Sequence, residues 1–482
     1  MSDPRNVLQN KFQDSHRYSN FGNVLMRMHV KGFRCHTNTV IEFKSPITAF
    51  CGLNGVGKST LLQLAASAYL GDTSQETYYI NNFIDSHKFD LKPFSDNAQV
   101  EYKFLKEGNS LQQLTISHKS SGGWDGYKRR PKRKVLFVKI GSYLPRIDKS
   151  DFINRYSEEV ELTSSDPVDP HVKEWTCKIL SQNYDDIFCR TFSYKKRTEK
   201  INSVQQGNII YSESHMGYGE ARSQYLIRLL EGLPNKSLIL IEEPEISLHP
   251  SAQHHFGCYL VDVAIRKSHQ IFLTTHSEFI LQALPSQSRV YLGKDFEGVK
   301  VIEGLTALEA QSLMTEGNVK ALHILVEDLC AKAILSELLR LADNGFLGSV
   351  AIHASGDYNT ISRTVRTLRE TGLPVVAVLD ADQTATPKEN IFKLPGTLPP
   401  EKELFSSEAV KNHIQSTYRL NLSDFMASLG EVDHHDWFKR LANRISIDEA
   451  ALVTEVARVY VKNDSAVCTS NLPQLLKEAS RK

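Results

Sequence analysis

Ten residues near the N-terminus, Cys51–Thr60, constrain the fold more than any other stretch of this 482-residue chain. Their sequence, CGLNGVGKST, fits the pattern G-x-x-x-x-G-K-[ST] from Gly52 to Ser59. A β-rich segment (47–50) precedes the loop, and an apolar helical pattern (59–70) follows it. In such loops, glycines let backbone N–H groups approach phosphates, the lysine reaches the outer phosphates and the hydroxyl binds Mg²⁺. The motif predicts an ATP or GTP site; the alternative is a glycine-rich turn without a nucleotide.

Composition gives an ordinary globular protein of two to three domains, with 41% hydrophobic residues, 23% charged residues and a net charge of +1. The seven cysteines form no C-x-x-C pair, which is typical of reduced thiols. No apolar run approaches the roughly 18 residues of a membrane span. We therefore expect a cytoplasmic protein without membrane segments. Residues 1–20 are polar, and we expect them to be poorly ordered.

A second element of the nucleotide site is the apolar run Leu238–Glu245, LILIEEPE, which ends in acidic residues. Acids at the carboxyl end of a buried strand lie where α/β sheets bind ligands. We predict that Glu242 holds the Mg²⁺ water shell and that Glu243 polarises the attacking water. His276 ends the next apolar strand, and we predict that it senses the γ-phosphate, although a lone histidine is more often structural.

The segment Met216–Arg222, MGYGEAR, begins a predicted helix. Glycines at a helix N-terminus form an anion site from free N–H groups and the helix dipole. The candidate nucleotide-binding residues are therefore Asn54, Gly55, Gly57, Lys58, Ser59, Thr60, Gly217, Gly219 and Glu220, with Ser59 and Glu242 as Mg²⁺ ligands.

Together these motifs resemble the ABC-type ATPases of the SMC-like branch over roughly residues 22–300. The resemblance implies that two ATPase modules sandwich two nucleotides, so that each signature loop caps the partner's γ-phosphate. A homodimer or higher oligomer is therefore expected. The signature serine position is Gly217 in this chain, which would leave capping to backbone N–H groups.

The basic run Lys128–Lys134, KRRPKRK, has two interpretations. It is either a solvated loop or a contact to a nucleic-acid backbone. Downstream, residues 151–210 are polar and are predicted to be mainly helical.

A new α/β pattern begins at residue 321, and its acids follow apolar strands. Glu327 and Asp328 follow the first strand, and Asp380 and Asp382 follow the third. Acids at the carboxyl ends of parallel strands converge on one crevice, where a hard divalent ion relieves their repulsion. The absence of Cys and His from this set favours Mg²⁺ or Mn²⁺ over zinc. The D-x-D alone is equally compatible with a plain turn.

This second pattern resembles the TOPRIM domain, with Glu after the first strand, Gly356 after the second and D-x-D after the third. An ABC ATPase followed by TOPRIM resembles the OLD-family nucleases (overcoming lysogenisation defect), some of which are linked to retrons. The resemblance implies two-metal cleavage of DNA, with Glu327, Asp380 and Asp382 as catalytic metal ligands. The family's further acid is Ala331 in this chain, and its usual glycine is Asp328.

The second metal site therefore needs ligands from another place. Asp328 is one candidate, and Glu401 and Glu403 in the sequence PPEKE are others, with Lys402 neutralising negative charge. The alternative is a solvated helix start with acids at its N-terminus. In the helical C-terminal region, His434 and His435 are adjacent and are expected to face different directions, as a poor metal pair.

The predicted organisation is a flexible N-terminus (1–21), an ABC-type ATPase domain (22–318) with a helical insertion (about 151–210), a TOPRIM domain (319–404) and a helical C-terminal region (405–482). The predicted function is an ATP-binding, metal-dependent DNA endonuclease of bacterial antiphage defence, controlled by its ATPase module and open to a nucleic-acid or protein regulator. One alternative is a DNA-binding regulatory or repair ATPase with an inactive TOPRIM domain. A transporter ATPase is disfavoured because the chain has no membrane span and carries an appended acidic domain.

Overall fold

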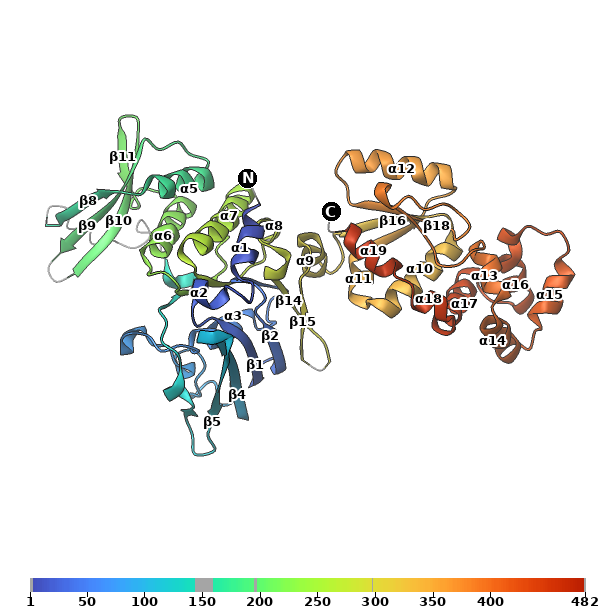
Figure 1. The fold of residues 1–482 in the computed structure, drawn as a ribbon, viewed down its shortest axis with the longest axis horizontal. Helices are drawn as coiled ribbons and strands as arrows, with labels where there is room; N and C mark the ends of the chain where they lie inside the picture. The colour runs from blue at the N-terminus through green and yellow to red at the C-terminus, as the bar shows by residue number, and fades with distance from the viewer. Residues whose placement is uncertain (1–2, 144–158, 195–196, 297, 481–482) are drawn as a thin grey trace. The chain divides into compact units, whose positions relative to one another are not determined.

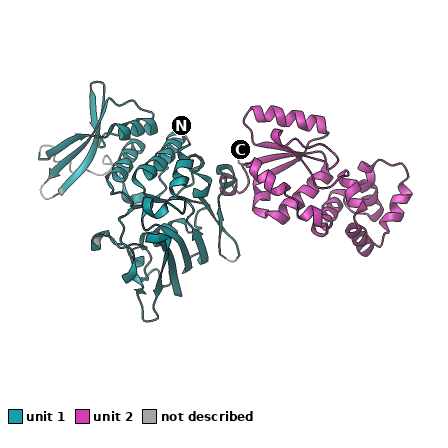
Figure 2. Ribbon diagram, viewed as in Figure 1, with its two compact units in different colours: residues 1–310 teal, residues 311–482 magenta. Residues whose placement is uncertain are grey.

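The chain forms two compact units, residues 1–310 and 311–482 (Figure 2). The computed structural model describes residues 3–143, 159–194, 197–296 and 298–480. The boundary lies before the predicted one at residue 318, in helix α9 (Ala307–Met314). The predicted TOPRIM and helical C-terminal regions share the second unit. In the described ranges, no helix is long and apolar enough to cross a membrane.

A six-stranded sheet forms the centre of the first unit (Figure 1). Its order is β15 (Val299–Glu303), β14 (Arg289–Lys294), β3 (Ile47–Cys51), β13 (Gln270–Thr274), β12 (Leu238–Glu242) and β7 (Val135–Val138). All neighbours are parallel except the β14–β15 pair. β3, β12 and β13 are buried along their whole length, as parallel strands covered on both faces require.

Helices and a second sheet surround this centre. The helices are α3 (Lys58–Ala66), α6 (Tyr218–Gly232), α7 (Pro250–Lys267) and α8 (Glu278–Ala283). The second sheet is antiparallel, in the order β2 (His36–Glu42), β1 (Leu25–Phe33), β4 (Phe94–Leu105), β5 (Leu111–His118) and β6 (Trp124–Asp125). The region after α3 contributes β4, β5 and β6 to this sheet. Short 3₁₀ turns are η1 (Ser74–Glu76), η2 (Ile80–Asn82), η3 (Glu107–Asn109), η4 (Tyr127–Arg129), η5 (Ile140–Ser142) and η6 (Ser286–Ser288).

The N-terminal segment is ordered, so the prediction of a flexible residue range 1–21 was wrong for the described residues. It forms α1 (Pro4–Lys11) and α2 (Arg17–Phe21). Leu8, Phe12 and Phe21 are buried, and the two phenyl rings meet edge to face at 5.4 Å. A few well-placed apolar side chains therefore anchor a segment whose composition is mostly polar.

The insertion at 151–210 is mainly β-structure, which corrects the helical prediction; residues 151–158 lie outside the described ranges. A four-stranded antiparallel sheet has the order β11 (Ile209–Ser212), β10 (Arg197–Gln206), β9 (Asp186–Tyr194) and β8 (Glu161–Pro167). Only α5 (Pro170–Leu180) is helical among the described residues of this insertion. Many side chains of these strands are polar and exposed. The amino-acid composition of the segment is therefore similar to that of a solvated helix, and it does not reveal the strands.

Two arginines of the basic run 128–134 are buried structural residues. Arg130 Nη1 donates to the carbonyl of Tyr78 at 2.8 Å, and also to those of Ser67 and Tyr69 at 3.1 Å. Arg133 Nε donates to the carbonyl of Lys236 at 2.7 Å, at the start of the central sheet. These side chains are therefore not available for a nucleic-acid backbone; Lys128, Arg129 and Lys132 lie nearer the surface.

We expect Arg133→Ala to lower the free energy of unfolding by about 3 kcal/mol, because it leaves buried carbonyl groups without donors. Besides Lys236, Arg133 also bonds Gln270 Oε1 at 3.0 Å. Urea unfolding of the full chain measures the change. A less buried neighbour gives the control, and Lys132→Ala should shift stability by less than about 0.5 kcal/mol. Equal effects of the two substitutions would contradict a structural role for Arg133.

The second unit is built on a four-stranded parallel sheet. Its order is β17 (Val350–Ala354), β16 (Leu322–Val326), β18 (Val375–Leu379) and β19 (Ile391–Lys393). α12 (Tyr358–Glu370) covers one face, and α10 (Leu329–Ala342) covers the other (Figure 1). The alternation along β18 shows this, since Val375 packs with α12 whereas Val376 packs with α10. The predicted α/β fold with a parallel second sheet is confirmed.

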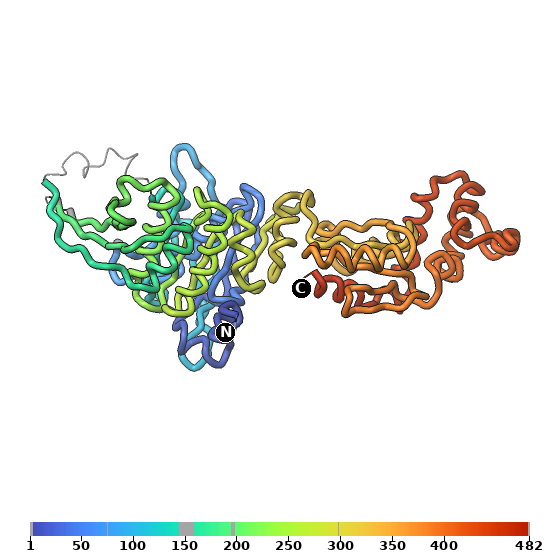
Figure 3. Tube along the Cα trace, turned by 90° about the horizontal axis from the view of Figure 1, so that it is seen from above, coloured from blue at the N-terminus to red at the C-terminus, as the bar shows by residue number. Residues whose placement is uncertain are grey.

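Further helices extend from this sheet, with α14–α16 at one end of the unit (Figure 1, Figure 3). They are α11 (Asn344–Ser349), α13 (Pro400–Ser406), α14 (Glu408–Tyr418), α15 (Leu422–Leu429), α16 (Trp437–Ile445), α17 (Glu449–Asn463), α18 (Ser465–Cys468) and α19 (Leu472–Ala479), with the turns η7 (Pro387–Glu389) and η8 (His434–Asp436). α17 shares one hydrophobic core with α10. The helical C-terminal region thus packs on α10, the helix that covers one face of the sheet.

Candidate functional site

Two glycines of the loop 52–59 are required by close backbone approach. Gly57 has φ 88° at the N-terminus of α3, and an added Cβ would lie 2.2 Å from His36 Nε2. At Gly52, φ is 137° and a Cβ would lie 2.2 Å from the carbonyl oxygen of Leu292. The backbone therefore forms a tight cradle at the start of a helix, which is the geometry that binds phosphate.

His36 supports this loop, and no sequence pattern predicted it. Its Nε2 lies 3.1 Å from the carbonyl oxygen of Gly57, and its Nδ1 lies 3.1 Å from Thr39 Oγ1. Burial lowers the pKa of His36, so the ring is neutral, with Nε2–H donating to Gly57. The histidine precedes the motif by more than ten residues, and no local pattern marks it.

Lys58 is buried beneath the loop. Its Nζ donates to the carbonyls of Gly52 at 2.8 Å and Leu53 at 2.9 Å. Asn54 and Gly55 are exposed on the loop, Ser59 is half-buried, and Thr60 is buried on α3. Burial lowers the pKa of Lys58, and the nearby Glu243 carboxylate opposes this shift.

The acids after β12 lie at the same edge of the sheet. Glu242 is buried, and Glu243 has φ 43°, an uncommon conformation for a residue with a side chain. Its N–H donates to the carbonyl of Thr274 at 3.1 Å. Burial and the Lys58 charge lower the pKa of His276, while Glu243 opposes them. The structure thus brings Lys58, Glu243 and His276 within electrostatic range of one another.

Glu245 is a further acid of this site, and no sequence pattern assigned it a role. Its Oε1 accepts a 2.6 Å hydrogen bond from the N–H of His276. Among the described residues, the buried Oε2 has no hydrogen-bond partner, and burial raises the pKa of the carboxyl. Glu245 therefore fixes the backbone of His276 beside the nucleotide loop.

The glycines before α6 lie against the turn after β12. Gly217 precedes the helix, and a Cβ on Gly219 would lie 2.3 Å from the carbonyl oxygen of Ser247. Arg222 of the same helix donates to the carbonyl of Glu243 at 3.0 Å. The N-terminal turn of α6, which contains Gly219 and Arg222, therefore contacts the turn that follows Glu243.

Glu220, predicted to contact the nucleotide, is held by the insertion instead. Its Oε1 accepts hydrogen bonds from Tyr184 Oη at 2.7 Å and Tyr211 Oη at 2.9 Å. Tyr211 belongs to β11 and Tyr184 precedes β9. Glu220 thus links the signature helix to the antiparallel sheet of the insertion.

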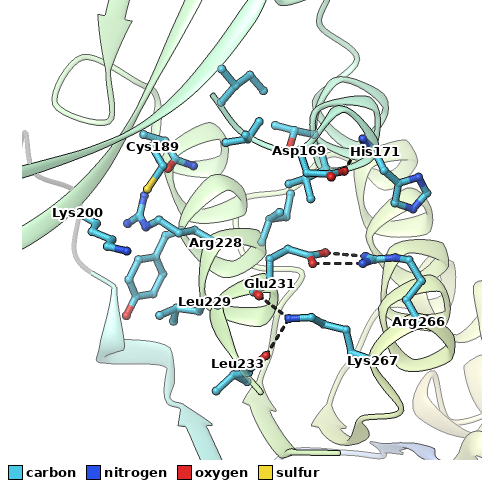
Figure 4. A pocket seen from close by; sticks show the side chains of 18 of the residues that line it. Asp169, His171, Cys189, Lys200, Arg228, Leu229, Glu231, Leu233, Arg266 and Lys267 are labelled. Carbon is cyan, nitrogen blue, oxygen red and sulfur yellow. Dashed lines mark hydrogen bonds and ion pairs between the residues drawn. The ribbon is translucent and has the colours of Figure 1, made fainter. Parts of the chain in front are cut away.

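A cavity of about 960 Å³ lies between the insertion and helices α6 and α7 (Figure 4). Glu231 and Arg266 form an ion pair at 2.6 Å on its wall, and Lys267 Nζ donates to the carbonyl of Leu233 at 2.8 Å. Among the described residues, its lining includes none of the predicted nucleotide-binding residues. The cavity is therefore separate from the phosphate loop.

In the second unit, the predicted strand-end acids converge. Glu327 Oε1 accepts a 3.0 Å hydrogen bond from the N–H of Asp380. Asp380 is 6% exposed, and its Oδ1 has no hydrogen-bond partner among the described residues. Burial, followed by the charges of Glu327, Asp328, Glu401 and Asp382, raises the pKa of Asp380 to about 8. An orphaned oxygen within converging carboxylates fits a hard divalent ion.

Glu401 joins this cluster from α13. It is 2% exposed, and its Oε2 is also without a hydrogen-bond partner among the described residues. Burial and the neighbouring Asp328 raise the pKa of Glu401 to about 7. Asp328 Oδ1 caps α10 by accepting from the N–H of Ala331 at 2.8 Å. Ala331 itself packs in the hydrophobic core, so this position supplies no carboxylate.

Glu403 has a different role from the predicted metal ligand. Its Oε1 accepts hydrogen bonds from the N–H groups of Thr397 at 2.7 Å and Leu398 at 2.9 Å. This oxygen stabilises the loop before α13. Lys402 is half-buried, and its charge lowers the pKa values of Asp433 and His434, after larger effects from other groups. Asp382 lies beside the cluster, where its charge raises the pKa of Asp380.

The prediction that His434 and His435 face different directions was wrong. They lie in the 3₁₀ turn η8 with ring centroids 4.1 Å apart. Each offers a ring nitrogen that lies, with a Glu401 oxygen, in a group whose atoms are all within 4.8 Å of one another. α-Helical spacing does not describe the pair, because it lies in a tight turn whose direction depends on packing against α13.

The pKa shifts predict that the metal-free second unit loses stability between about pH 4 and pH 8. The pKa of Asp380 rises from an ordinary value of 3.8 to about 8 in the folded chain, so the folded state retains a proton that the unfolded state releases. The contribution of Asp380 to the free energy of unfolding is therefore complete below pH 3.8, and it is lost as the pH rises to about 8. A difference of about four pKa units corresponds to a loss of up to about 6 kcal/mol, or more than roughly 10 °C in Tm.

Calorimetry of the full chain in chelator at several pH values measures this dependence. Asp380→Asn should flatten it, because an amide does not titrate. A metal-free Tm that rises over this pH range would contradict the burial of an ionisable Asp380.

A family model and solved structures are similar to parts of this chain. The family model of the AAA ATPase domain matches residues 25–158 and 146–281, which is more than half of the chain. The chain belongs to the AAA ATPase domain family. The SMC head domain from Thermotoga maritima has a TM-score of 0.36 at 16% identity and covers 58% of this chain and 98% of that one. An SMC head bound to the C-terminal winged-helix domain of ScpA has a TM-score of 0.40 at 15% identity, covering 58% and 97%.

Curated relatives of this AAA-family chain include OLD nucleases. Protein ea59 of Escherichia phage lambda is 22% identical over 322 residues, 63% of this chain and 60% of that protein. The OLD nuclease of Thermus scotoductus is 23% identical over 317 residues, 53% and 59% of the two chains. The Old nuclease of Escherichia phage P2 is 30% identical over 116 residues, 22% and 20%. The predicted OLD relationship is confirmed, and the chain spans about three fifths of the first two relatives.

Proposed function

We propose that the chain is an ATP-binding, divalent-metal-dependent DNA endonuclease whose ATPase module controls cleavage, acting in bacterial antiphage defence. The observation that carries this proposal is the buried Asp380 carboxylate, with an unpartnered oxygen among four other carboxylates of the described residues. Two relatives named as OLD nucleases support the substrate class. Antiphage defence and DNA as the substrate rest on the family relationship.

Mg²⁺ or Mn²⁺ would be held by Glu327, Asp380 and Asp382 in a TOPRIM-like domain, with Asp328 and Glu401 toward a second position. When bound, such ions lower the pKa of water and stabilise charge on phosphate oxygens. The chain's own residues set the geometry. The N–H of Asp380 orients Glu327, and the rigid carboxyl ends of β16 and β18 fix both acids.

Lys402, whose charge acts on Asp433 and His434, would contribute a positive charge toward the scissile phosphate. Its ammonium group would neutralise negative charge that develops during phosphodiester cleavage. Because Lys402 lies on α13 next to the buried Glu401, the same helix would position both groups.

In the ATPase module, Lys58, Ser59 and Thr60 with the backbone from Asn54 to Gly57 would hold the nucleotide phosphates and, with Glu242, Mg²⁺. Glu243 would accept a proton from the attacking water, and His276 would orient the γ-phosphate. Gly217 and Gly219 would face the nucleotide of a second copy in a homodimer. Since Arg222 connects α6 to the Glu243 turn, dimer closure and the hydrolytic residue would be coupled.

Supercoiled plasmid provides the test. The full chain should nick it with Mn²⁺ or Mg²⁺ and ATP, and not in chelator. The rate should differ among ATP, ADP and nucleotide-free arms if the ATPase module controls cleavage. Identical rates in all three arms would contradict control of cleavage by the nucleotide. Cleavage that persists in chelator would contradict the dependence on metal.

A further inference from the structure

A group of mixed nitrogen and oxygen ligands lies beside the carboxylates, and the metal roles assigned so far leave its histidines unused. It consists of Glu401 from α13 and of His434 and His435 from η8. One ligand atom from each lies within 4.8 Å of the other two. The helical C-terminal segment therefore contributes side chains to the edge of the acid cluster.

Glu401 supplies the independent sign of a ligand. It is only 2% exposed, and its Oε2 has no hydrogen-bond donor among the residues that the structure describes. A buried carboxylate oxygen without a partner is costly unless a cation satisfies it. The other oxygen, Oε1, lies 3.7 Å from His435 Nδ1. Ligand atoms of one tetrahedral ion lie about 3.3 Å apart, so this pair needs only a small adjustment, whereas the other pairs are known to lie within 4.8 Å.

The surroundings of His434 suit a metal ligand. Its Nδ1 lies 3.3 Å from Asp433 Oδ1, which also accepts a hydrogen bond from the N–H of His435 at 3.0 Å. A carboxylate on one ring nitrogen leaves the other nitrogen free to bind metal and fixes the ring orientation. Burial, followed by the charges of His435 and Lys402, lowers the pKa of His434 and favours the neutral, ligating form.

We propose that Glu401, His434 and His435 form a binding site for a divalent transition-metal ion, with Zn²⁺ or Co²⁺ preferred over Mg²⁺ and with Mn²⁺ as a more weakly bound ion that serves as a paramagnetic probe. Imidazole is a good ligand for Zn²⁺ and other late first-row metals, and Mn²⁺ is the weakest binder of that row, whereas Mg²⁺ selects oxygen ligands and retained water. The role of this ion rests on the proposed nuclease function, because Glu401 also borders Asp328 and, through it, the acids after β16 and β18. The site would make the C-terminal helices part of the metal centre.

Pulsed electron paramagnetic resonance of the full chain with Mn²⁺ provides the decisive readout. A directly bound imidazole gives nitrogen modulation of the Mn²⁺ signal, which carboxylates and water do not give. We expect this modulation in the wild-type chain and its loss in the variant carrying both His434→Gln and His435→Gln. Calorimetric Mn²⁺ affinity should fall about tenfold or more, with Mg²⁺ affinity unchanged.

Each single glutamine variant provides the measurement if the double variant does not fold. His353→Ala, an exposed histidine on β17, should retain the nitrogen modulation. Absence of nitrogen modulation in the wild type at saturating Mn²⁺ would overturn the site. If the chain nicks plasmid but shows no nitrogen modulation, the nuclease proposal stands and the histidine metal site is contradicted. If the chain shows the modulation but never cuts DNA, the histidine metal site stands and the nuclease proposal is contradicted.

Discussion

Replacement of Asp380 by alanine is expected to reduce DNA cleavage about a thousandfold and to leave ATP hydrolysis unchanged. Asp380 is the most deeply placed acid at the strand ends, and it neighbours Glu327, Asp328, Glu401 and Asp382. Loss of a metal ligand removes several kcal/mol of transition-state charge stabilisation, and about 4 kcal/mol corresponds to a factor of a thousand. Initial rates of plasmid nicking in Mn²⁺ measure the effect.

The variant is also informative about folding. Without metal, burial and the neighbouring carboxylates make the ionised form of Asp380 unfavourable. Replacing this side chain should therefore not lower the Tm of the metal-free chain. Asp424→Ala, an exposed acid on α15, is the matched control and should nick plasmid at the wild-type rate. Undiminished nicking by Asp380→Ala would contradict the assignment of the acid cluster.

The second large effect is expected for Glu243→Gln, which should slow ATP hydrolysis at least about a hundredfold with ATP affinity retained. Glu243 lies near Lys58 and His276, and its strained backbone conformation is held by the Thr274 carbonyl. Glutamine keeps the shape but cannot accept a proton, and general-base catalysis contributes roughly 10²–10⁴-fold. Steady-state phosphate release and equilibrium nucleotide binding separate the two steps.

Glu174→Gln gives the control, since this glutamate is exposed on α5. It should hydrolyse ATP normally. If Glu243→Gln hydrolysed ATP at the wild-type rate, the base would have to be another acid, such as Glu245, whose charge also acts on Lys58. If it failed to bind ATP, Glu243 would be a binding residue instead.

Local sequence patterns predicted the elements that carry their own chemistry. The loop at Gly52–Ser59 and the strand-end acids at Glu242 and Asp380 lie on the strands and turns that these patterns indicate. These features are encoded within ten residues, because strand burial, glycine conformation and the acid that follows a strand are all local. Within each unit, the convergence of its own residues at the carboxyl edge of its own sheet then follows from parallel topology.

The residues that were missed depend on contacts distant in sequence. His36 is the first residue of β2 and contacts the carbonyl of Gly57, which follows β3. Glu245 accepts a hydrogen bond from the backbone N–H of His276. His434 and His435 approach Glu401 only because the C-terminal helices pack onto α10 and α13. The insertion was assigned to helices because its exposed strands carry few apolar residues, so tertiary pairing overrides composition there.

The most direct test of a metal centre at the strand-end acids is anomalous diffraction from crystals of the full chain grown with Mn²⁺. We predict a Mn²⁺ peak within coordination distance of Asp380 and Glu327, and loss of that peak in Asp380→Ala. Saturating Mn²⁺ with no peak among these carboxylates would contradict the metal centre. It would then favour a DNA-binding regulatory or repair ATPase whose second domain does not cut DNA.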